Sequence, residues 1–319
     1  MKLMINGVAL NDPQRPYIIA EAAGTHGQDY STAAGLVHAA AQAGADAIKF
    51  QTFIAEDICA DIPLPFGHDP ASDAWLQRLG VTRMRELFAR GGLPRPWHKP
   101  LKALAQALGL AFLSTPFSVD AARFLVEDIG VPALKMASGD ITFRPLLEYA
   151  RTTGLPILVS TGASTLDEVL NTRTLLQGEN PTQAIVFLHC VCAYPCPPEA
   201  ANLAAIQHLR AFTGLEETVG WSDHTTSPDI VPALAVAMGA TVIEKHLRLA
   251  GDTSSIDAGH SIDPDAFAAL TTLVRQVPGL LGTGEKIPHG IEGHERLWIR
   301  RDPSDWKRPM QSARAGKWA

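Results

Sequence analysis

The sequence predicts an α/β protein, a closed (β/α)₈ TIM barrel with a short N-terminal hairpin. Eight strand-like apolar segments follow one another, each before a helix-like segment, so that neighbouring strands would run parallel. No glycine-rich dinucleotide fingerprint follows the first strand, which counts against an open Rossmann-type sheet. At 319 residues the chain is long enough for such a barrel. We expect the hairpin at residues 1–16, the barrel at 17–282 and a C-terminal tail at 283–319.

The first third of the chain contains the hairpin and three strands. Asn6-Gly7 is a tight-turn dipeptide between apolar runs, so residues 1–10 are expected to form the hairpin and to cap one end of the barrel. The proline-rich connection 53–80 is longer than an ordinary strand-to-helix loop, and it is either a lid over the substrate or a surface excursion. The elements expected here are strands at 17–21, 45–51 and 111–115 and helices at about 31–44, 82–90 and 96–108.

Capping residues locate the later helices. Ser118 is an expected N-cap, and Thr165 with Glu168 has the spacing of a capping box. Ser227-Pro228 is interpreted as an N-cap followed by a first-turn proline. The elements expected here are strands at 133–140 (with its loop), 156–162, 184–190, 218–224 and 241–246, and helices that end at Gly130, at Gly154, at Gly239 and, after an Asp263-Pro264 cap, before Pro278.

Polar side chains follow at the end of each expected strand, and in a barrel these ends line one mouth, where active sites lie. Two lysines, Lys49 and Lys135, suit a small anion that carries phosphate or carboxylate. The alternative is a buried salt bridge from either lysine to Glu21, Asp140 or Glu244. The polar residues expected near the mouth are Glu21, Lys49, Gln51, Thr115, Lys135, Ser138, Ser160, His189, Ser222, Asp223, His224, Glu244, Lys245 and His246.

Two histidines, His224 and His246, end successive parallel strands that are joined by one crossover helix. Side chains so placed come from the same end of the sheet, at a distance at which they can share a metal ion. A divalent metal held there would act as a Lewis acid on a carbonyl oxygen, and an anion beside a polarised carbonyl suggests carbon–carbon bond formation. The alternative is that each histidine is a hydrogen-bonded structural residue.

Composition excludes several classes of function. The net charge is −6 and no basic face is evident, so nucleic acid is not an expected partner. The N-terminal residues lack the apolar core of a signal peptide and no run is long enough to span a membrane, so we expect a cytoplasmic protein with reduced thiols. Cys190, Cys192 and Cys196 are interpreted as structural rather than as a soft-metal site, because nothing nearby completes a tetrahedral ligand set.

Several motifs occur in order between residue 17 and about residue 270, and together they resemble the sialic acid synthase family. They are Ile19-Ala20-Glu21 with His26, the run from Gly44 to Thr52, Ser114-Thr115-Pro116-Phe117, Lys135-Met136-Ala137-Ser138-Gly139-Asp140, Ser160-Thr161-Gly162, His189-Cys190, Tyr194-Pro195, Ser222-Asp223-His224-Thr225 and Glu244-Lys245-His246.

The resemblance implies a transferase that condenses phosphoenolpyruvate with an open-chain N-acylated sugar, typically N-acetylmannosamine, in a metal-dependent barrel. It implies that His224 and His246 bind a divalent ion, Mn²⁺ or Mg²⁺, and we expect a homodimer. The residues implied to hold phosphoenolpyruvate are Lys49, Thr115, Lys135, Ser138 and Ser160, and those implied to face the sugar are Glu21, Gln51, Tyr194 and Asp257. We add Asp140 and Ser222 to the substrate-binding set, and count Glu21, Lys49 and Lys135 with the two histidines as catalytic.

Departures from the family pattern lie on the sugar side. The family's Glu-Ile-Gly-x-Asn-His-x-Gly run is changed after Glu21, and Cys192 stands where an asparagine is expected. We also expect the chain to lack the family's C-terminal antifreeze-like domain, which lends an arginine to the partner subunit's sugar site. The acceptor is therefore expected to differ from N-acetylmannosamine. Two alternatives stay open, a non-catalytic binding paralogue and a Schiff-base aldolase that uses Lys135 or Lys245.

Overall fold

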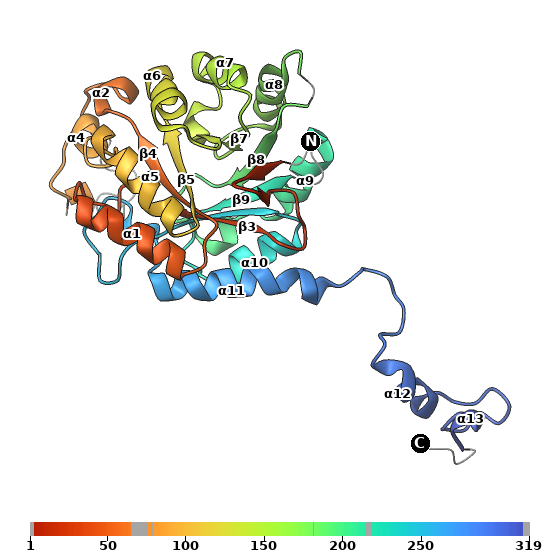
Figure 1. Ribbon diagram of the computed structural model, residues 1–319. Coiled ribbons are helices and arrows are strands. Elements are labelled where there is room, and N and C mark those ends of the chain that lie inside the picture. The colour runs from red at the N-terminus through yellow and green to blue at the C-terminus, as the bar shows by residue number, and fades with distance from the viewer. Residues whose placement is uncertain (1–2, 65–75, 78, 181, 215–217, 315–319) are drawn as a thin grey trace. The chain divides into compact units, whose positions relative to one another are not determined.

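The computed structural model describes residues 3–64, 76–77, 79–180, 182–214 and 218–314, and the chain divides into two compact units, Met1–Leu280 and Leu281–Ala319. In the first unit eight parallel strands stand in the order β5-β4-β3-β10-β9-β8-β7-β6, and β5 also lies beside β6, so that the sheet curls into a barrel (Figure 1). The predicted (β/α)₈ barrel is thus confirmed. The strands are β3 Tyr17–Glu21, β4 Ala47–Thr52, β5 Ala111–Pro116, β6 Leu134–Met136, β7 Ile157–Ser160, β8 Ile185–Cys190, β9 Val219–Asp223 and β10 Val242–His246.

Helices follow the strands and cover the outside of the barrel (Figure 1). The capping box at Thr165 and Glu168 is present, and Ser118 accepts a hydrogen bond from the backbone of Ala121. Among the described residues, the helices that accompany the barrel are α1 Tyr30–Gln42, α2 Ala55–Ile58, α4 Met84–Phe88, α5 His98–Ala107, α6 Val119–Arg123, α7 Arg144–Thr152, α8 Leu166–Gln177, α9 Ala204–Thr213, α10 Ile230–Ala237 and α11 Pro264–Leu281, with a π-helical turn at Phe124–Ile129 and 3₁₀ turns at Arg95–Trp97, Ser138–Asp140, Pro198–Ala200 and Ala258–His260.

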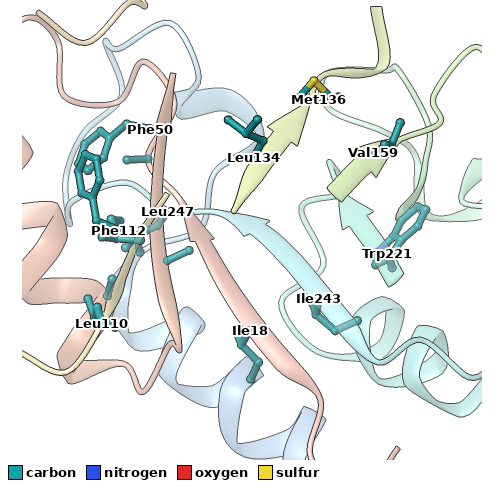
Figure 2. Packing of buried hydrophobic residues seen from close by; sticks show 14 of the residues in the cluster. Ile18, Phe50, Leu110, Phe112, Leu134, Met136, Val159, Trp221, Ile243 and Leu247 are labelled. Carbon is teal, nitrogen blue, oxygen red and sulfur yellow. The ribbon is translucent and has the colours of Figure 1, made fainter. Parts of the chain in front are cut away.

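Two apolar cores form because successive side chains of a strand point to opposite faces. In β3, Ile18 and Ala20 belong to the core between strands and helices, whereas Tyr17 and Ile19 belong to a second core inside the barrel. Figure 2 shows part of the outer core, where the stacked rings of Phe50 and Phe112 have centroids 5.7 Å apart. The same alternation runs through every strand, so it decides which strand-end residues reach the barrel interior.

The N-terminal hairpin closes the amino-terminal end of the barrel interior. Strands β1 (Met4–Ile5) and β2 (Val8–Ala9) pair antiparallel around Asn6-Gly7, where both residues have positive φ. Leu3, Ile5 and Leu10 are buried against the inner core. The predicted hairpin and its capping position are confirmed.

Two helix boundaries were predicted wrongly. Helix α11 continues through Pro278 to Leu281, because near the helix end the proline removes one intrahelical bond while its ring and Val277 stay buried. The N-cap of α10 is Asp229, whose carboxylate accepts from the backbone of Ile230, and not Ser227. Ser227 instead donates its hydroxyl proton to that carboxylate, so Pro228 precedes the helix.

The long connection after β4 is described in part. It contains α2, and Leu64, Leu76 and Val81 form a small apolar cluster of their own. Residues 65–75 and 78 of the candidate lid lie outside the described residues.

The second unit contains α12 (Glu292–Ile299) and α13 (Gln311–Arg314). Asp302 organises its loop by accepting hydrogen bonds from Ser304 and from the backbone of Gln311. Arg314 forms an ion pair with Asp305.

Candidate active site

The mouth of the barrel is lined by polar residues at the carboxyl ends of the strands. Most of them lie two or four positions after an inward-facing apolar residue and therefore also face inward. Register places Cys190, Ser222 and Glu244 side by side on β8, β9 and β10. It likewise places His246, Glu21 and Lys49 side by side on β10, β3 and β4. Lys135 on β6 and Ser160 on β7 follow inward-facing apolar residues, Ala133 and Leu158. The predicted gathering of polar side chains at one end of the barrel is therefore present.

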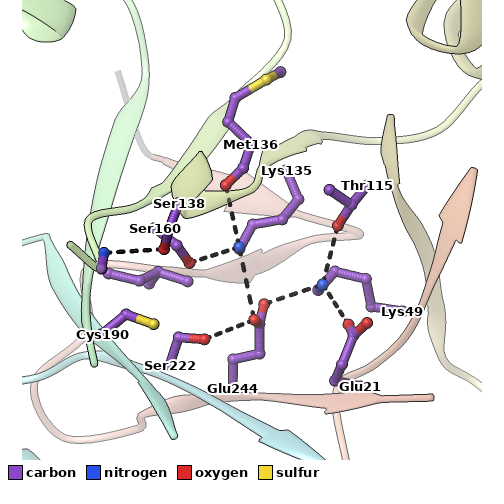
Figure 3. Close-up of polar contacts among 12 residues, drawn as sticks. Glu21, Lys49, Thr115, Lys135, Met136, Ser138, Ser160, Cys190, Ser222 and Glu244 are labelled. Atoms are coloured by element: carbon purple, nitrogen blue, oxygen red, sulfur yellow. Dashed lines mark hydrogen bonds and ion pairs between the residues drawn. The ribbon is translucent and has the colours of Figure 1, made fainter. Parts of the chain in front are cut away.

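Two lysines and two glutamates form a buried network in this mouth (Figure 3). Lys49 Nζ forms an ion pair with Glu21, lies 3.5 Å from Glu244 Oε2 and donates to Thr115 Oγ1 at 3.1 Å. Lys135 Nζ donates to Ser160 Oγ at 2.6 Å and to the carbonyl oxygen of Met136 at 3.2 Å, and it lies 3.6 Å from Glu244 Oε1.

The hydroxyl of Ser222 donates to Glu244 Oε1 at 2.9 Å and holds that carboxylate between the two lysines. The salt-bridge alternative considered for the lysines is thus realised with Glu21 and Glu244. A site with two buried cations and two buried anions is electrically balanced before any ligand enters.

Burial and mutual attraction set the protonation of this network. Burial raises the pKa of Glu21 to about 7, against the opposing effect of Lys49. Burial also opposes the charges on Lys49 and Glu244, but their oppositely charged neighbours hold the pKa of Lys49 above its ordinary value and that of Glu244 below. The pKa of Lys135 is lowered by burial. Glu21 is therefore the member of the network that takes up a proton most readily near neutral pH.

The histidines form a second cluster beside the network. The ring centroids of His224 and His246 are 5.4 Å apart, and a third imidazole, His260, lies 4.4 Å from the ring of His246 and 5.9 Å from that of His224. Asp257 Oδ1 lies 3.4 Å from His260 Nε2. The prediction that His224 and His246 lie close together is confirmed. His260 was missed, although its place three residues after Asp257 could have pointed to it.

Burial favours the neutral form of all three imidazoles. Burial lowers the pKa of His224 and of His260 to about 4, and it lowers that of His246 well below its ordinary value. His224 Nδ1 lies 2.9 Å from the carbonyl oxygen of Val191, so the tautomer that donates there leaves Nε2 free. Neutral imidazole beside carboxylate is a donor set that suits a divalent metal, so these residues fit the ion that the sequence implied.

Four other predicted residues lie near these clusters. Gln51 Nε2 is 3.4 Å from Glu21 Oε1, and Ser138 Oγ accepts from the backbone of Gly162. The ring of Tyr194 packs against that of His224, with centroids 4.3 Å apart. Asp140 follows Ser138 in the turn after β6, and burial raises its pKa to about 6.

Lys245 and His189 do not point into the mouth, because each occupies an outward-facing position of its strand. Lys245 is fully buried and paired with Asp223 Oδ2 at 3.0 Å, outside the lysine and glutamate network. His189 packs against Trp221 of the outer core and lies 3.0 Å from the carbonyl oxygen of Ala201. The inward-facing residue at the end of β8 is Cys190, and Asp223 and Lys245 pair with each other on the outward-facing side. The expectation that His189, Asp223 and Lys245 line the mouth was therefore wrong.

The cysteines are free thiols and do not act as one cluster. Cys190 and Cys192 both lie against Gly162, where a Cβ atom would meet Cys190 Sγ at 3.2 Å and would also collide with Cys192 Sγ. Cys196 instead belongs to the loop that pairs with Thr225. Cys192 is exposed, and the Tyr194 hydroxyl lies 4.0 Å from its sulfur, so its thiol is at the mouth.

Comparison with known proteins identifies the family. Residues 36–286 match the NeuB family. The chain belongs to that family. It is 36% identical over 292 residues to the N,N'-diacetyllegionaminic acid synthase of Legionella pneumophila, and the alignment covers 89% of this chain and 78% of that protein. It is 34% identical over 278 residues to the pseudaminic acid synthase of Helicobacter pylori, and the alignment covers 86% of this chain and 77% of that protein.

A solved structure supports the same assignment. The crystal structure of N-acetylneuraminic acid (sialic acid) synthetase from Leptospira borgpetersenii serovar Hardjo-bovis in complex with citrate superposes with a TM-score of 0.77 at 31% identity, covering 92% of this chain and 95% of that one. The resemblance to sialic acid synthases is confirmed, and this NeuB-family chain is an enzyme of the sialic acid synthase type. Within the part of the chain that the structure describes, no helix is long and apolar enough to cross a membrane.

Proposed function

We propose that this protein condenses phosphoenolpyruvate with an aldose, in a reaction that needs a divalent metal, to give a 2-keto-3-deoxy sugar acid and phosphate. The observation that carries the proposal is the pair of clusters at one barrel mouth, in which two lysines lie beside neutral histidines. Lysines suit an anionic donor, and histidines suit a metal that activates a carbonyl. The names of the relatives, which are synthases of sialic-type acids, support this reaction class.

The donor would be bound by Lys49 and Lys135. Each ammonium group has three N–H donors and already shares them with a hydroxyl, Thr115 for Lys49 and Ser160 for Lys135. Phosphate and carboxylate oxygens can replace the glutamate oxygens as acceptors of these protons. The hydroxyls would then orient the ammonium groups towards the donor.

Charge balance gives Glu21 a defined part in donor binding. Because the two lysines are already balanced by Glu21 and Glu244, an anion that enters before the divalent ion leaves excess negative charge in a buried site. Glu21, whose pKa burial raises to about 7, can remove part of this excess by taking up a proton. Protonated Glu21 releases Lys49 for the donor.

His224 and His246 would hold the divalent ion, Mn²⁺ or Mg²⁺, as the family resemblance implies. The bound ion would polarise the aldehyde of the acceptor as a Lewis acid. Carbon C3 of phosphoenolpyruvate would attack the aldehyde carbon, whose oxygen would take up a proton to become a hydroxyl. Water would add at C2 and lose a proton, and phosphate would leave by cleavage of the bond between C2 and the bridging oxygen, which gives the 2-keto group. Lys49 and Lys135 would hold the donor in place through these steps.

The acceptor would lie on the side of Glu21, Gln51, Tyr194 and Asp257. By the family resemblance, Cys192 stands there in place of an asparagine, so one hydrogen-bonding partner for an N-acyl group would be replaced by a thiol. An unpaired buried amide costs about 1–3 kcal/mol. We therefore propose that the preferred acceptor is an aldose other than N-acetylmannosamine.

The test is an aldose panel assayed for phosphate release from phosphoenolpyruvate. Release that requires an aldose supports the proposal, and highest turnover per KM with N-acetylmannosamine would refute the acceptor assignment. A chelator should abolish release and Mn²⁺ should restore it. If no aldose supports release, the non-catalytic paralogue is favoured, and borohydride trapping of pyruvate on Lys135 would favour the aldolase.

We propose further that the enzyme is a cytoplasmic homodimer. Its four cysteines are free thiols, which is typical of proteins in a reducing compartment. Sedimentation of the purified chain tests the oligomeric state, and a monomer at micromolar concentration would contradict it.

A further inference from the structure

The histidine cluster contains two buried ring nitrogens that no hydrogen bond within the described chain satisfies, and one of them belongs to His260, to which the proposed reaction gives no role. Among the residues that the structure describes, His260 Nε2 and His246 Nδ1 are buried without a hydrogen-bond partner. The exposed fractions of the two residues are 4% and 6%. A buried ring nitrogen without a partner lowers stability unless a group from outside the chain satisfies it.

Asp257 completes a compact group with these histidines. Ligand atoms of His246, Asp257 and His260 all lie within 4.8 Å of one another. Asp257 uses Oδ2 to accept the backbone N–H of Gly24 at 2.7 Å, which leaves Oδ1 directed to His260 at 3.4 Å. The pair at 3.4 Å forms no hydrogen bond among the described contacts, so a simple structural His–Asp pair does not account for it.

The loop after β10 holds these side chains firmly in place. Ser261 Oγ donates to the carbonyl oxygen of Asp257 at 2.6 Å, and residues 258–260 form a 3₁₀ turn. A Cβ atom added at Gly24 would lie 2.9 Å from Asp257 Oδ2, so that glycine permits the close approach of its N–H. A site whose ligands are fixed by surrounding contacts is typical of metal centres.

We infer that His260 and Asp257 join His246 and His224 as ligands of the divalent ion. The inference rests on the proposed function, because that function supplies the ion, and it adds two ligands to the histidine pair that the sequence implied. A set of three imidazoles and one carboxylate favours Mn²⁺, Fe²⁺, Co²⁺ or Zn²⁺ over Mg²⁺, which prefers oxygen ligands and retains its waters. Asp257, which the resemblance assigned to the sugar, then serves the metal.

The experiment measures Mn²⁺ binding to the metal-free full chain by electron paramagnetic resonance, with no substrate present. His260→Gln should weaken Mn²⁺ binding by on the order of tenfold or more. His189→Gln is the matched control, since His189 is a buried histidine that points away from the mouth, and its Mn²⁺ affinity should equal that of the unaltered chain. A hundredfold excess of Mg²⁺ should not displace Mn²⁺.

Pulsed electron paramagnetic resonance of the unaltered Mn²⁺ complex counts coordinated imidazole nitrogens, and it does not depend on a variant folding. Three imidazoles support the inference, and two overturn it. Unchanged Mn²⁺ affinity in His260→Gln together with loss in His224→Gln would overturn the inference while leaving the proposed function intact. Absence of any Mn²⁺ binding to the unaltered chain would overturn both.

Discussion

Lys49 and Lys135 each compensate buried negative charge, and both are proposed to bind the anionic donor. Replacing either lysine by alanine should weaken phosphoenolpyruvate binding by on the order of 2 kcal/mol or more, the usual magnitude for loss of a charge-assisted contact. Titration calorimetry with the metal present measures this change. Unchanged affinity in both variants would exclude the assigned role.

Lys245 provides the contrasting case of a buried lysine with a purely structural role. Its Nζ pairs with Asp223 and donates to the carbonyl oxygen of Thr225, and both side chains of the pair are fully buried. Lys245→Met should lower the free energy of unfolding by about 3–5 kcal/mol, because Asp223 is left as an unpaired buried charge. Denaturant unfolding measures the loss.

Lys99→Met is the control for that substitution, since Lys99 is exposed on α5 and should change stability by less than about 0.5 kcal/mol. Equal effects of the two substitutions would contradict the structural role of Lys245. Binding of phosphoenolpyruvate by Lys245→Met should match that of the unaltered chain.

Strand β9 carries a glycine that the packing of its neighbours requires. A Cβ atom at Gly220 would lie 2.5 Å from the carbonyl oxygen of Val242 and would collide with Leu188, and the carbonyl belongs to the backbone of β10. Gly220→Ala should therefore destabilise the barrel by about 1–3 kcal/mol or more.

Gly279→Ala is the matched control in α11. Among the described residues no heavy atom lies within 4 Å of a Cβ atom placed there. Alanine should be neutral or should stabilise the helix by up to about 1 kcal/mol. Thermal unfolding of both variants measures the difference. A Gly220→Ala protein as stable as the unaltered chain would show that β9 can move away from its neighbouring strands at little cost in free energy, contrary to this prediction.

The elements were largely predictable because strands and caps depend on local sequence. Apolar runs located the strands, and Thr165 with Glu168 located the start of α8. The end of α11 was predicted too early because the intrahelical bond lost at Pro278 is offset by burial of residues around it, which the local sequence does not reveal. His189 misled for a different reason. Successive side chains of β8 face opposite sides, so His189 faces outward because its neighbour Cys190 faces inward, and the sequence does not show which of the two faces inward.

We expect the N-terminal hairpin and the barrel interior to unfold together, because the hairpin supplies apolar side chains to the inner core. Ile5 is fully buried, whereas Met4, its neighbour in the same strand, is 37% exposed. Ile5→Ala should lower the free energy of unfolding by about 2–5 kcal/mol, and Met4→Ala should leave it nearly unchanged. Chemical denaturation of the two variants is the measurement, and equal small effects would mean that the hairpin is not part of the cooperative unit.

The location of the site was predictable from the sequence, whereas its ion pairs and hydrogen bonds were less so. Strand ends fixed where Glu21, Lys49 and Lys135 would gather, but sequence carries no distance between strands, so the pairing of both lysines with Glu244 emerged from the structure. His260 comes from a loop rather than from a strand end, and no strand pattern signals such a residue. Loops place side chains by contacts distant in sequence, such as that of Asp257 with Gly24.

The most direct test of the proposed condensation uses phosphoenolpyruvate labelled with ¹⁸O in the oxygen that bridges C2 and phosphorus. The metal-loaded enzyme is incubated with this donor and an accepted aldose, and the phosphate is analysed by mass spectrometry. We predict one labelled phosphate for each 2-keto acid formed, and none without aldose, because C–O cleavage transfers the bridging oxygen to phosphate. Unlabelled phosphate, or release that does not depend on the aldose, would contradict the account.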